Sequence, residues 1–458
     1  MNKTYSKHAL YFIISIFFFW GFIAASNGIL IPLFKDKFHL TQFQSQFVDL
    51  AFYMAYGIGS LVYYLSSISK GDFLNKIGYK KGLILGLLIS AVGALVFIPA
   101  VKFDSYGLLL AALFIIGLGF ALQQIVANPF VINFGDVSKS SQRLNLAGGV
   151  NSFGTTIGPV ILSYILFGKI DSPKAFDGNI SHIIIPAVIL FGLFVLSALV
   201  LHFSNLPEIK NEEKTSSGSG VFKYPQLTLG MIAIFVYVGV EVTIVSNIAP
   251  FLALKEIKGI DHTKISHFVS LYWGSLMIGR LMGSVSVFKV SKNVQLGLKF
   301  LLPGLAFGLV YLVNYMRGSN VSDFNYYIPF VVAGVVLIHF SDKNATKMLL
   351  YTSVAAMVMM ILGLNTKGDF AMFSFISGGL FCSVMWPCIY TIAISGLGKY
   401  VNQGSSMLIM MIIGGAIIPP LQGALADATN PHFSYIVTVF CFAYLAWYAY
   451  RFKNIEAQ

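Results

Sequence analysis

The chain has 458 residues, of which 57% are hydrophobic and only 10% are charged, and its mean hydropathy is +0.78. Soluble globular domains carry about 25% charged residues. The composition therefore excludes a soluble protein and indicates a membrane protein. The formal net charge of +12 is interpreted as the topology of membrane loops, not as a nucleic-acid surface.

Apolar runs fill most of the chain, and most are near the ~20 residues that a helix needs to cross a bilayer. The first run is too long for the apolar core of a signal peptide and lacks a small-residue cleavage site, so it is expected to remain as a span. A re-entrant or shortened helix is the alternative for the short run at 326-340. In chain order the fourteen runs lie near 9-34, 44-68, 82-101, 106-134, 144-168, 182-203, 226-254, 265-288, 295-316, 326-340, 345-363, 370-395, 404-425 and 432-450.

The basic residues predict the orientation of these spans. An even number of spans places both termini on one side of the membrane. If the N-terminus is cytoplasmic, the inside segments carry twenty of the thirty Lys and Arg residues. Cytoplasmic loops are enriched in basic residues, so we expect both termini in the cytoplasm of a multi-pass protein of the cell inner membrane.

A polar segment at 205-226 divides the chain into an N-terminal half of six spans, 1-204, and a C-terminal half of eight, 227-458. This segment is predicted to be a flexible cytoplasmic linker. Each half repeats a proline interval: Pro129 and Pro159 are 30 residues apart, and Pro387 and Pro419 are 32 apart. Internal repeats of this kind are typical of secondary transporters.

The halves differ by about forty residues. Aligning Gly21 with Gly239 gives an offset of 218 residues, whereas aligning Pro129 with Pro387 gives 258. We interpret the surplus as a hydrophobic hairpin at about 293-342, inserted between the eighth and ninth spans of a 6+6 core. The alternative is that its two runs are core spans and that the others are misnumbered.

Several polar side chains fall inside the apolar runs, where a polar group without a partner costs several kcal/mol (order of magnitude). Such groups usually face a water-filled path. Gln124 and Asn128 are four residues apart on one helical face, and their amides can donate to and accept from the hydroxyl groups of a ligand. Hydrogen bonding between helices is the alternative, and Asn27 could instead cap a helix break. The set is Asn27, Gln123, Gln124, Asn128, Asn151 and Glu241.

Two of the charged membrane residues are carboxylates. Glu241 lies well inside the seventh span. It either stays charged by binding a cation or the hydroxyl groups of a ligand, or it cycles a proton. A neutral acid bonded to a neighbouring helix is the alternative. Asp49 lies about five residues from the start of its span, so a solvated interfacial side chain is the alternative for it. Sodium needs one carboxylate and neutral oxygens, and the sequence leaves sodium and protons equally open as coupling ions.

Tryptophan and arginine supply further candidates. Trp20, Trp273 and Trp386 lie within spans, where an indole can pack against the apolar face of a ligand ring or against other helices. Arg143 and Arg280 lie near the predicted cytoplasmic ends of the fifth and eighth core spans. A fixed guanidinium there could hold helix ends or carboxylates in one conformational state, or simply anchor the topology.

A set of motifs distributed over the core resembles the bacterial L-fucose permease and glucose/galactose transporter family of the major facilitator superfamily. The resemblance implies an all-α 6+6 helical fold, alternating access and cation-coupled uptake of a monosaccharide, with Asn151 facing the sugar cavity. The motifs are Phe18-Phe19-Trp20-Gly21, Asn27 to Pro32, Ala51-Phe52-Tyr53, Ala127-Asn128-Pro129-Phe130, Arg143 to Ala147, Asn151 to Gly154, Tyr237-Val238-Gly239, Gly279-Arg280, Gly404-Ser405-Ser406 and Ile413-Gly414-Gly415.

The chain departs from this family at two places. Proton-coupled members have a carboxylate after the first-span Asn and another four residues before Asn-Pro-Phe, where this chain has Gly28 and Gln124. Neither residue can carry a proton near neutral pH, so that mechanism does not transfer to these positions. The segment from Gly71-Asp72 to Lys80-Lys81 resembles the loop between spans two and three of facilitator proteins, which implies conformational control by Asp72 and Lys80.

The sequence contains no phosphate-binding loop, no nucleophile and base constellation and no metal spacing, so neither an enzyme nor an ATP-driven pump is expected. We predict a monomeric secondary transporter that takes up a hexose-type monosaccharide by sodium or proton symport. No cofactor beyond that coupling ion is expected, and no metal beyond a possible sodium site. The alternatives are an uncoupled sugar facilitator and a transporter-like sugar sensor. The sequence does not identify the sugar.

Overall fold

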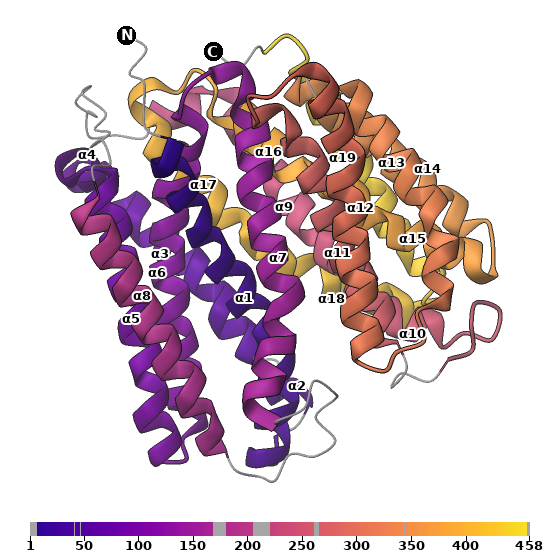
Figure 1. Cartoon of the computed structure of the whole chain (residues 1–458), viewed down its shortest axis with the longest axis horizontal. Coiled ribbons are helices and arrows are strands. Elements are labelled where there is room, and N and C mark those ends of the chain that lie inside the picture. The colour runs from indigo at the N-terminus through magenta and orange to yellow at the C-terminus, as the bar shows by residue number, and fades with distance from the viewer. Residues whose placement is uncertain are drawn as a thin grey trace. The chain divides into compact units, whose positions relative to one another are not determined.

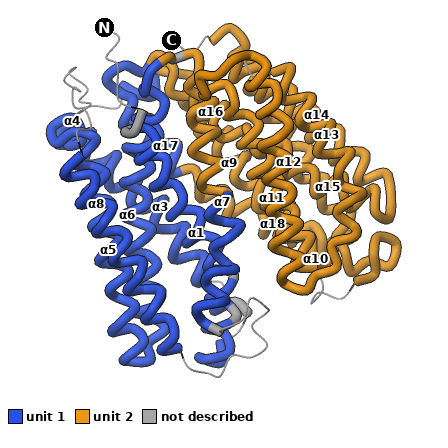
Figure 2. The backbone as a smooth tube through the Cα atoms, viewed as in Figure 1, with its two compact units in different colours: residues 1–135, 153–223, 397–410 blue, residues 136–152, 224–396, 411–458 orange. Residues whose placement is uncertain are grey.

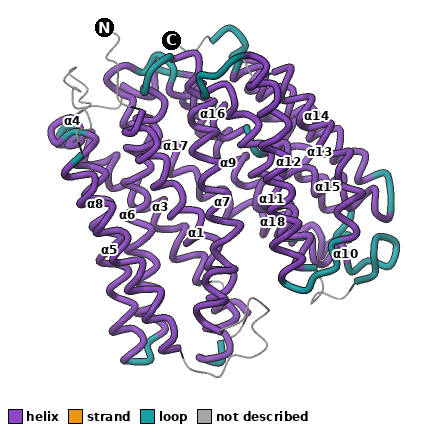
Figure 3. Tube along the Cα trace, viewed as in Figure 1, coloured by secondary structure: helices purple, strands orange, loops and turns teal. Residues whose placement is uncertain are grey.

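The computed structural model describes residues 7–40, 42–45, 47–167, 180–204, 220–260, 265–341 and 344–455. Within these ranges every regular element is a helix, and helices joined by short loops account for nearly all of the chain (Figure 1, Figure 3). The predicted all-α fold class is therefore confirmed.

The described part of the N-terminal half contributes six long helices and two short ones. The long helices follow the predicted apolar runs closely, because each run supplies about the ~20 apolar residues that a spanning helix needs. The helices are α1 (Lys7–Phe38), α2 (Gln42–Ser45), α3 (Phe47–Lys70), α4 (Phe73–Ile77), α5 (Tyr79–Lys102), α6 (Tyr106–Asn133), α7 (Ser140–Phe167) and α8 (Ile184–Phe203).

The C-terminal half contains more helices, and three of its predicted spans are interrupted. The breaks fall at Asn247, at Ser383–Val384 and at the 3-10 turn Met411–Ile413. The helices are α9 (Pro225–Ser246), α10 (Ile248–Leu252), α11 (Ser266–Ser284), α12 (Lys292–Met316), α13 (Ile328–Ser341), α14 (Ala345–Leu364), α15 (Gly368–Cys382), α16 (Met385–Ile394), α17 (Val401–Met410), α18 (Gly414–Ala428) and α19 (Ile436–Arg451).

Among the described residues, thirteen helical segments are long and apolar enough to cross a membrane. The expected run at 265-288 forms α11 but is not one of the thirteen. The short run at 326-340 is part of a longer segment, Ser322–Ser341, which begins with a 3-10 turn and has 20 residues. This length is sufficient for a full crossing.

The chain forms two compact units, each drawn mostly from one half of the sequence, with two short segments exchanged (Figure 2). Unit 1 comprises residues 1–135, 153–223 and 397–410, and unit 2 comprises residues 136–152, 224–396 and 411–458. The start of α7 thus belongs with the C-terminal helices, and the whole of α17 belongs with the N-terminal helices. Most of the predicted linker, 205–219, lies outside the described residues.

Helix packing within the units supports the predicted duplication. In unit 1, α5 packs against α6 and α8, and α3 packs against α6. In unit 2, α14 packs against α15 and α19, and α11 packs against α15. The helices α12 and α13 pack on α11 outside this repeated pattern. Their origin as an inserted hairpin stays a prediction that this packing supports.

Small residues bring α5 and α6 into close contact. A Cβ atom at Gly119 of α6 would lie 2.7 Å from the backbone nitrogen of Ser90 in α5, and one at Gly93 would lie 2.7 Å from that of Ile116. Glycine at these positions lets the two backbones approach, as is common between membrane helices. The contact fixes α6, which carries three of the candidate amides, against its neighbour.

Candidate functional site

The first membrane carboxylate lies where α1 and α3 meet. Asp49, in the first turn of α3, accepts a hydrogen bond from Asn27 Nδ2 at 3.1 Å. Asn27 is 1% exposed, and its Oδ1 atom has no hydrogen-bond partner among the described residues. Asp49 is half-buried. A carboxylate beside an amide oxygen can hold a proton or a sodium ion.

Gln123 of α6 is enclosed by two hydrogen bonds. Its Oε1 atom accepts from Trp20 Nε1 at 3.0 Å, and its Nε2 atom donates to Ser90 Oγ at 3.0 Å. Gln123 is fully buried, and Trp20 is buried against Phe17, with ring centroids 4.1 Å apart. In this conformation Gln123 orients the Trp20 indole, and neither side chain is open to a ligand.

Gln124 and Asn128 are more available for hydrogen bonding to a ligand. The half-buried Gln124 donates to Tyr56 Oη at 3.2 Å, which leaves its amide oxygen with accepting capacity. Asn128 is fully buried, and neither its Oδ1 nor its Nδ2 atom has a hydrogen-bond partner among the described residues. A buried amide in this condition costs about 1–3 kcal/mol unless water or a ligand satisfies it.

The second membrane carboxylate, that of Glu241, forms an ion pair with an arginine. Glu241 Oε1 of α9 lies 3.5 Å from Arg280 Nη2 of α11, and the two side chains are 12% and 13% exposed. Arg280 Nη1 also donates to Ser152 Oγ at 2.8 Å. Both charged residues were predicted from the sequence as functional candidates, but with different roles. The structure brings them together, with the half-buried Asn151 next to Ser152 on α7.

The remaining tryptophan candidates are half-buried in unit 2. Trp386 is the second residue of α16, just after the break between α15 and α16, and its ring centroid lies 6.2 Å from those of Tyr237 and Tyr390. Trp273 of α11 lies beside Tyr272, with ring centroids 5.5 Å apart. Partial exposure leaves both indoles with surface that a sugar ring can contact.

Asp72 connects the loop after α3 with the start of α17. It accepts hydrogen bonds from Tyr63 Oη at 2.6 Å and from Asn402 Nδ2 at 2.7 Å, and it caps α4. Asn402 is itself fully buried and accepts from Tyr79 Oη at 2.6 Å. Asp72 thus holds a segment from the other half of the sequence, and its role in conformational control stays a prediction.

Lys80 and Arg143 both donate hydrogen bonds to backbone carbonyl oxygens. Lys80 Nζ donates to the carbonyl oxygens of His202 and Ser204 at 2.9 and 2.7 Å, at the end of α8. A cation at a helix C-terminus is favourable because carbonyl groups there lack partners. Arg143 Nη1 donates to the carbonyl oxygen of Asp136 at 2.7 Å. Hydrogen bonds from Ser138 hold the pKa of the exposed Asp136 carboxyl below its ordinary value.

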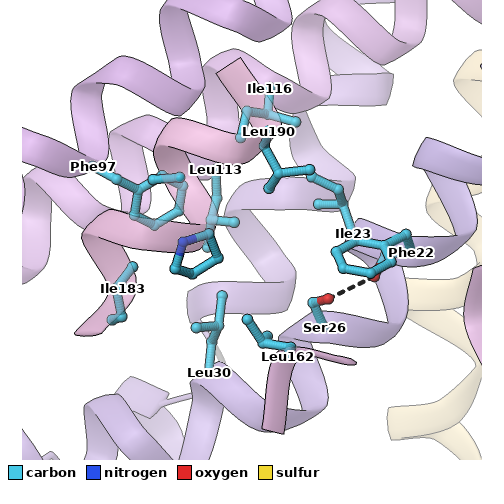
Figure 4. Close-up of a pocket in the computed structure, with 12 residues that line it drawn as sticks. Phe22, Ile23, Ser26, Leu30, Phe97, Leu113, Ile116, Leu162, Ile183 and Leu190 are labelled. Atoms are coloured by element: carbon cyan, nitrogen blue, oxygen red, sulfur yellow. Dashed lines mark hydrogen bonds between the residues drawn. The ribbon is translucent and has the colours of Figure 1, made fainter. Parts of the chain in front are cut away.

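An apolar pocket lies within unit 1 (Figure 4). It has a cavity volume of about 40 Å³ and is lined by side chains of α1, α5, α6, α7 and α8. Its polar lining residue, Ser26, donates its hydroxyl to the carbonyl oxygen of Phe22 at 2.6 Å. None of the predicted site residues lines this pocket, and its surface offers a sugar no free polar group.

The hydrogen-bond partners that organise these sites were not predicted from the sequence. Tyr56, Ser152 and Asn402 each bond a predicted residue, yet hydroxyl and amide side chains recur in the apolar runs too often to stand out. Asn402 also lies just before the run at 404-425. In the described part of the chain, no group of three or more His, Cys, Asp and Glu side chains could hold a metal ion.

Comparison with known proteins places the chain in a family. Residues 11–324 match the Major Facilitator Superfamily, which is more than half of the chain. The chain therefore belongs to the Major Facilitator Superfamily, as its motifs predicted, and it is a multi-pass membrane protein of a transporter family.

Its relatives define a sugar-transporting branch. The chain is 30% identical over 436 residues to the glucose/galactose transporter of Brucella abortus, covering 94% of this chain and 91% of the relative. It is 26% identical over 466 residues to the L-fucose-proton symporter of Escherichia coli, with 97% and 92% covered. A crystal structure of the Escherichia coli fucose:proton symporter superimposes with a TM-score of 0.74 at 23% identity and covers 98% of each chain.

Proposed function

We propose that this protein takes up a hexose-type monosaccharide by cation-coupled symport, with alternating exposure of sugar and cation to the two sides of the membrane. The observation that carries the proposal is the Asn27–Asp49 hydrogen bond of 3.1 Å inside unit 1. The Asp49 carboxylate lies in a membrane span, and its hydrogen-bond partner carries no charge. A coupling cation requires such an unneutralised carboxylate.

The sugar is proposed to bind to amides and indoles that retain free hydrogen-bonding capacity or surface. Gln124 and Asn128 lie on one face of α6, and Asn128 is buried without a partner among the described residues. Such amides can meet both donor and acceptor hydroxyls of a sugar. The half-buried Trp273 and Trp386 supply flat apolar faces, and Asn151 and Glu241 are the further polar candidates.

Sodium and protons are both compatible coupling ions. The relatives named above include an L-fucose-proton symporter, which favours a proton. Gly28 and Gln124 replace the two carboxylates of the family's proton mechanism, which favours sodium at Asp49 or Glu241. The same replacements favour an uncoupled facilitator as the second candidate function. We place both termini in the cytoplasm and regard the transporter as a monomer.

The test is uptake of radiolabelled glucose, galactose, fucose and N-acetylglucosamine into proteoliposomes. Each sugar is offered under a sodium gradient, under a proton gradient and with no gradient. Symport predicts that one gradient drives at least one sugar above its external concentration. Equilibration without accumulation under every gradient would establish the facilitator, and absence of any sugar flux would contradict both functions.

A further inference from the structure

Arg280 occupies a cage of oxygen acceptors in unit 2. Besides Glu241 and Ser152, its guanidinium reaches two backbone carbonyl groups, with Nε 3.2 Å from Ser383 O and Nη1 3.4 Å from Gly148 O. The carbonyl of Ser383 lies at the break between α15 and α16. Interrupted membrane helices expose such carbonyls, and transporters use them to coordinate cations.

Two glycines make room for this arrangement. A Cβ atom at Gly148 of α7 would lie 3.1 Å from Arg280 Cδ, and one at Gly279 would overlap the side chain of Ser383. Glycine at these positions allows α7 and the break after α15 to approach the arginine. The cage is therefore formed by backbone shape as well as by side-chain charge.

We propose that Arg280 is a tethered cation that permanently neutralises and positions Glu241, so that the transported coupling ion binds at Asp49. The inference rests on the proposed symport function, and it selects Asp49 over Glu241 as the site of the coupling ion. A guanidinium stays protonated at all physiological pH values. A second cation arriving at Glu241 would therefore meet a fixed positive charge already bonded to the same carboxylate.

In the described part of the chain, the surroundings of Glu241 contain no other charge that could change this balance. Among the described residues, the titratable groups that interact electrostatically with it besides Arg280 are Tyr237, Tyr272 and Cys382. All three are uncharged near neutral pH. The pair is thus neutral as a unit.

Asp49 differs in the nature of its partner. Asn27 donates a hydrogen bond but carries no charge, and no ion pair with Asp49 occurs among the described residues. Its charge therefore remains to be balanced by a mobile ion. Asn27 Oδ1, buried and without a described partner, is a neutral oxygen available beside it.

The test compares Glu241→Gln, Arg280→Gln and the double variant in proteoliposomes. Each single variant leaves one buried charge unpaired, so sugar counterflow is expected to slow about tenfold or more. The double variant removes both charges and is expected to exchange sugar faster than either single variant, since the pair acts as a unit. It also keeps the wild-type cation dependence of accumulation. Arg451→Gln is the matched control, because Arg451 is exposed.

A double variant that equilibrates sugar but no longer accumulates it would overturn the proposal, because Glu241 would then carry the coupling ion. A second measurement uses Arg280→Ala with millimolar guanidinium chloride as the probe. Counterflow is expected to rise when guanidinium refills the cage, and to stay unchanged in Arg280→Ala/Glu241→Gln. An equal response in both variants would contradict the tethered-cation role.

Failure of the symport function itself is distinguishable from failure of this inference. Thermal unfolding of the detergent-purified variants needs no sugar or gradient. The double variant is expected to lose less stability than the sum of the two single variants. Additive losses would show that the two residues do not act as a pair, whatever the wild type transports.

Discussion

Asn27 donates a hydrogen bond to Asp49 and so joins α1 to α3 through an amide and a carboxylate. The amide stabilises the carboxylate without cancelling its charge, and a charge inside a membrane span is costly. In unit 2 the corresponding cost is met differently, because Glu241 is paired with Arg280. The two membrane carboxylates therefore have unlike environments, and we expect unlike roles.

The two adjacent glutamines of α6 are predicted to have different roles: Gln123 contributes to stability, and Gln124 contributes to sugar binding. Gln123→Leu removes the partner of Trp20 Nε1 and one partner of Ser90 Oγ, so unfolding should become easier by about 1–3 kcal/mol. Gln124→Leu loses one bond to Tyr56 from a half-buried site, so stability should change little. If Gln124 bonds the sugar, its replacement should raise KM about tenfold, the equivalent of ~1.4 kcal/mol.

Thermal unfolding in detergent and sugar uptake kinetics check this pair, and each variant serves as the control for the other. A Gln123→Leu protein with unchanged stability would show that the bonds to Trp20 and Ser90 contribute little. A Gln124→Leu protein with unchanged KM would remove Gln124 from the proposed sugar site.

Asn128→Leu is predicted to weaken sugar binding without destabilising the fold. Leucine has nearly the same shape as asparagine, and it removes two buried polar atoms that have no described partner. Stability should therefore stay constant or rise by up to about 2 kcal/mol, while sugar affinity falls about tenfold. Unfolding and equilibrium sugar binding measure the two effects. A marked loss of stability would mean that the amide is bonded in the folded protein.

Asn402→Leu is predicted to release the start of α17. It removes the hydrogen bonds to Asp72 and Tyr79, so hydrogen exchange of residues 401–410 should accelerate about tenfold. Lys80→Met is the matched control, since Lys80 bonds the end of α8 and should accelerate exchange there instead. Equal protection of residues 401–410 in the wild type and Asn402→Leu would refute the role of Asp72 in holding α17.

Much of the fold could be predicted from hydropathy, because a spanning helix needs a long apolar run whatever it packs against. The run at 326-340 was too short only because the 3-10 turn before it, Ser322–Tyr327, is rich in polar residues. The exchange of residues 136–152 and 397–410 between the two units could not be predicted. It depends on contacts between segments hundreds of residues apart, which leave no periodic signal in one sequence.

The site was predicted as residue types but not as pairs. Gln123 and Gln124 were both identified because they are polar residues inside an apolar run. Only the structure shows that the amide oxygen of Gln123 already accepts a hydrogen bond from Trp20. Likewise, Glu241 and Arg280 each stood out as membrane charges, but their pairing depends on how α9 packs beside α11. The sequence shows which polar groups are buried at a cost in free energy. The partner that offsets this cost is a tertiary contact, which the sequence does not show.

The most direct test of the account is Asp49→Asn in proteoliposomes, measured both as gradient-driven accumulation and as sugar counterflow. Asparagine keeps the shape of the side chain and its place beside Asn27 but carries no charge. Asp104→Asn, on the exposed turn between α5 and α6, is the control. We predict that Asp49→Asn loses accumulation under the driving gradient and keeps counterflow, while Asp104→Asn keeps both. Undiminished accumulation by Asp49→Asn would contradict the assignment of the coupling ion to Asp49.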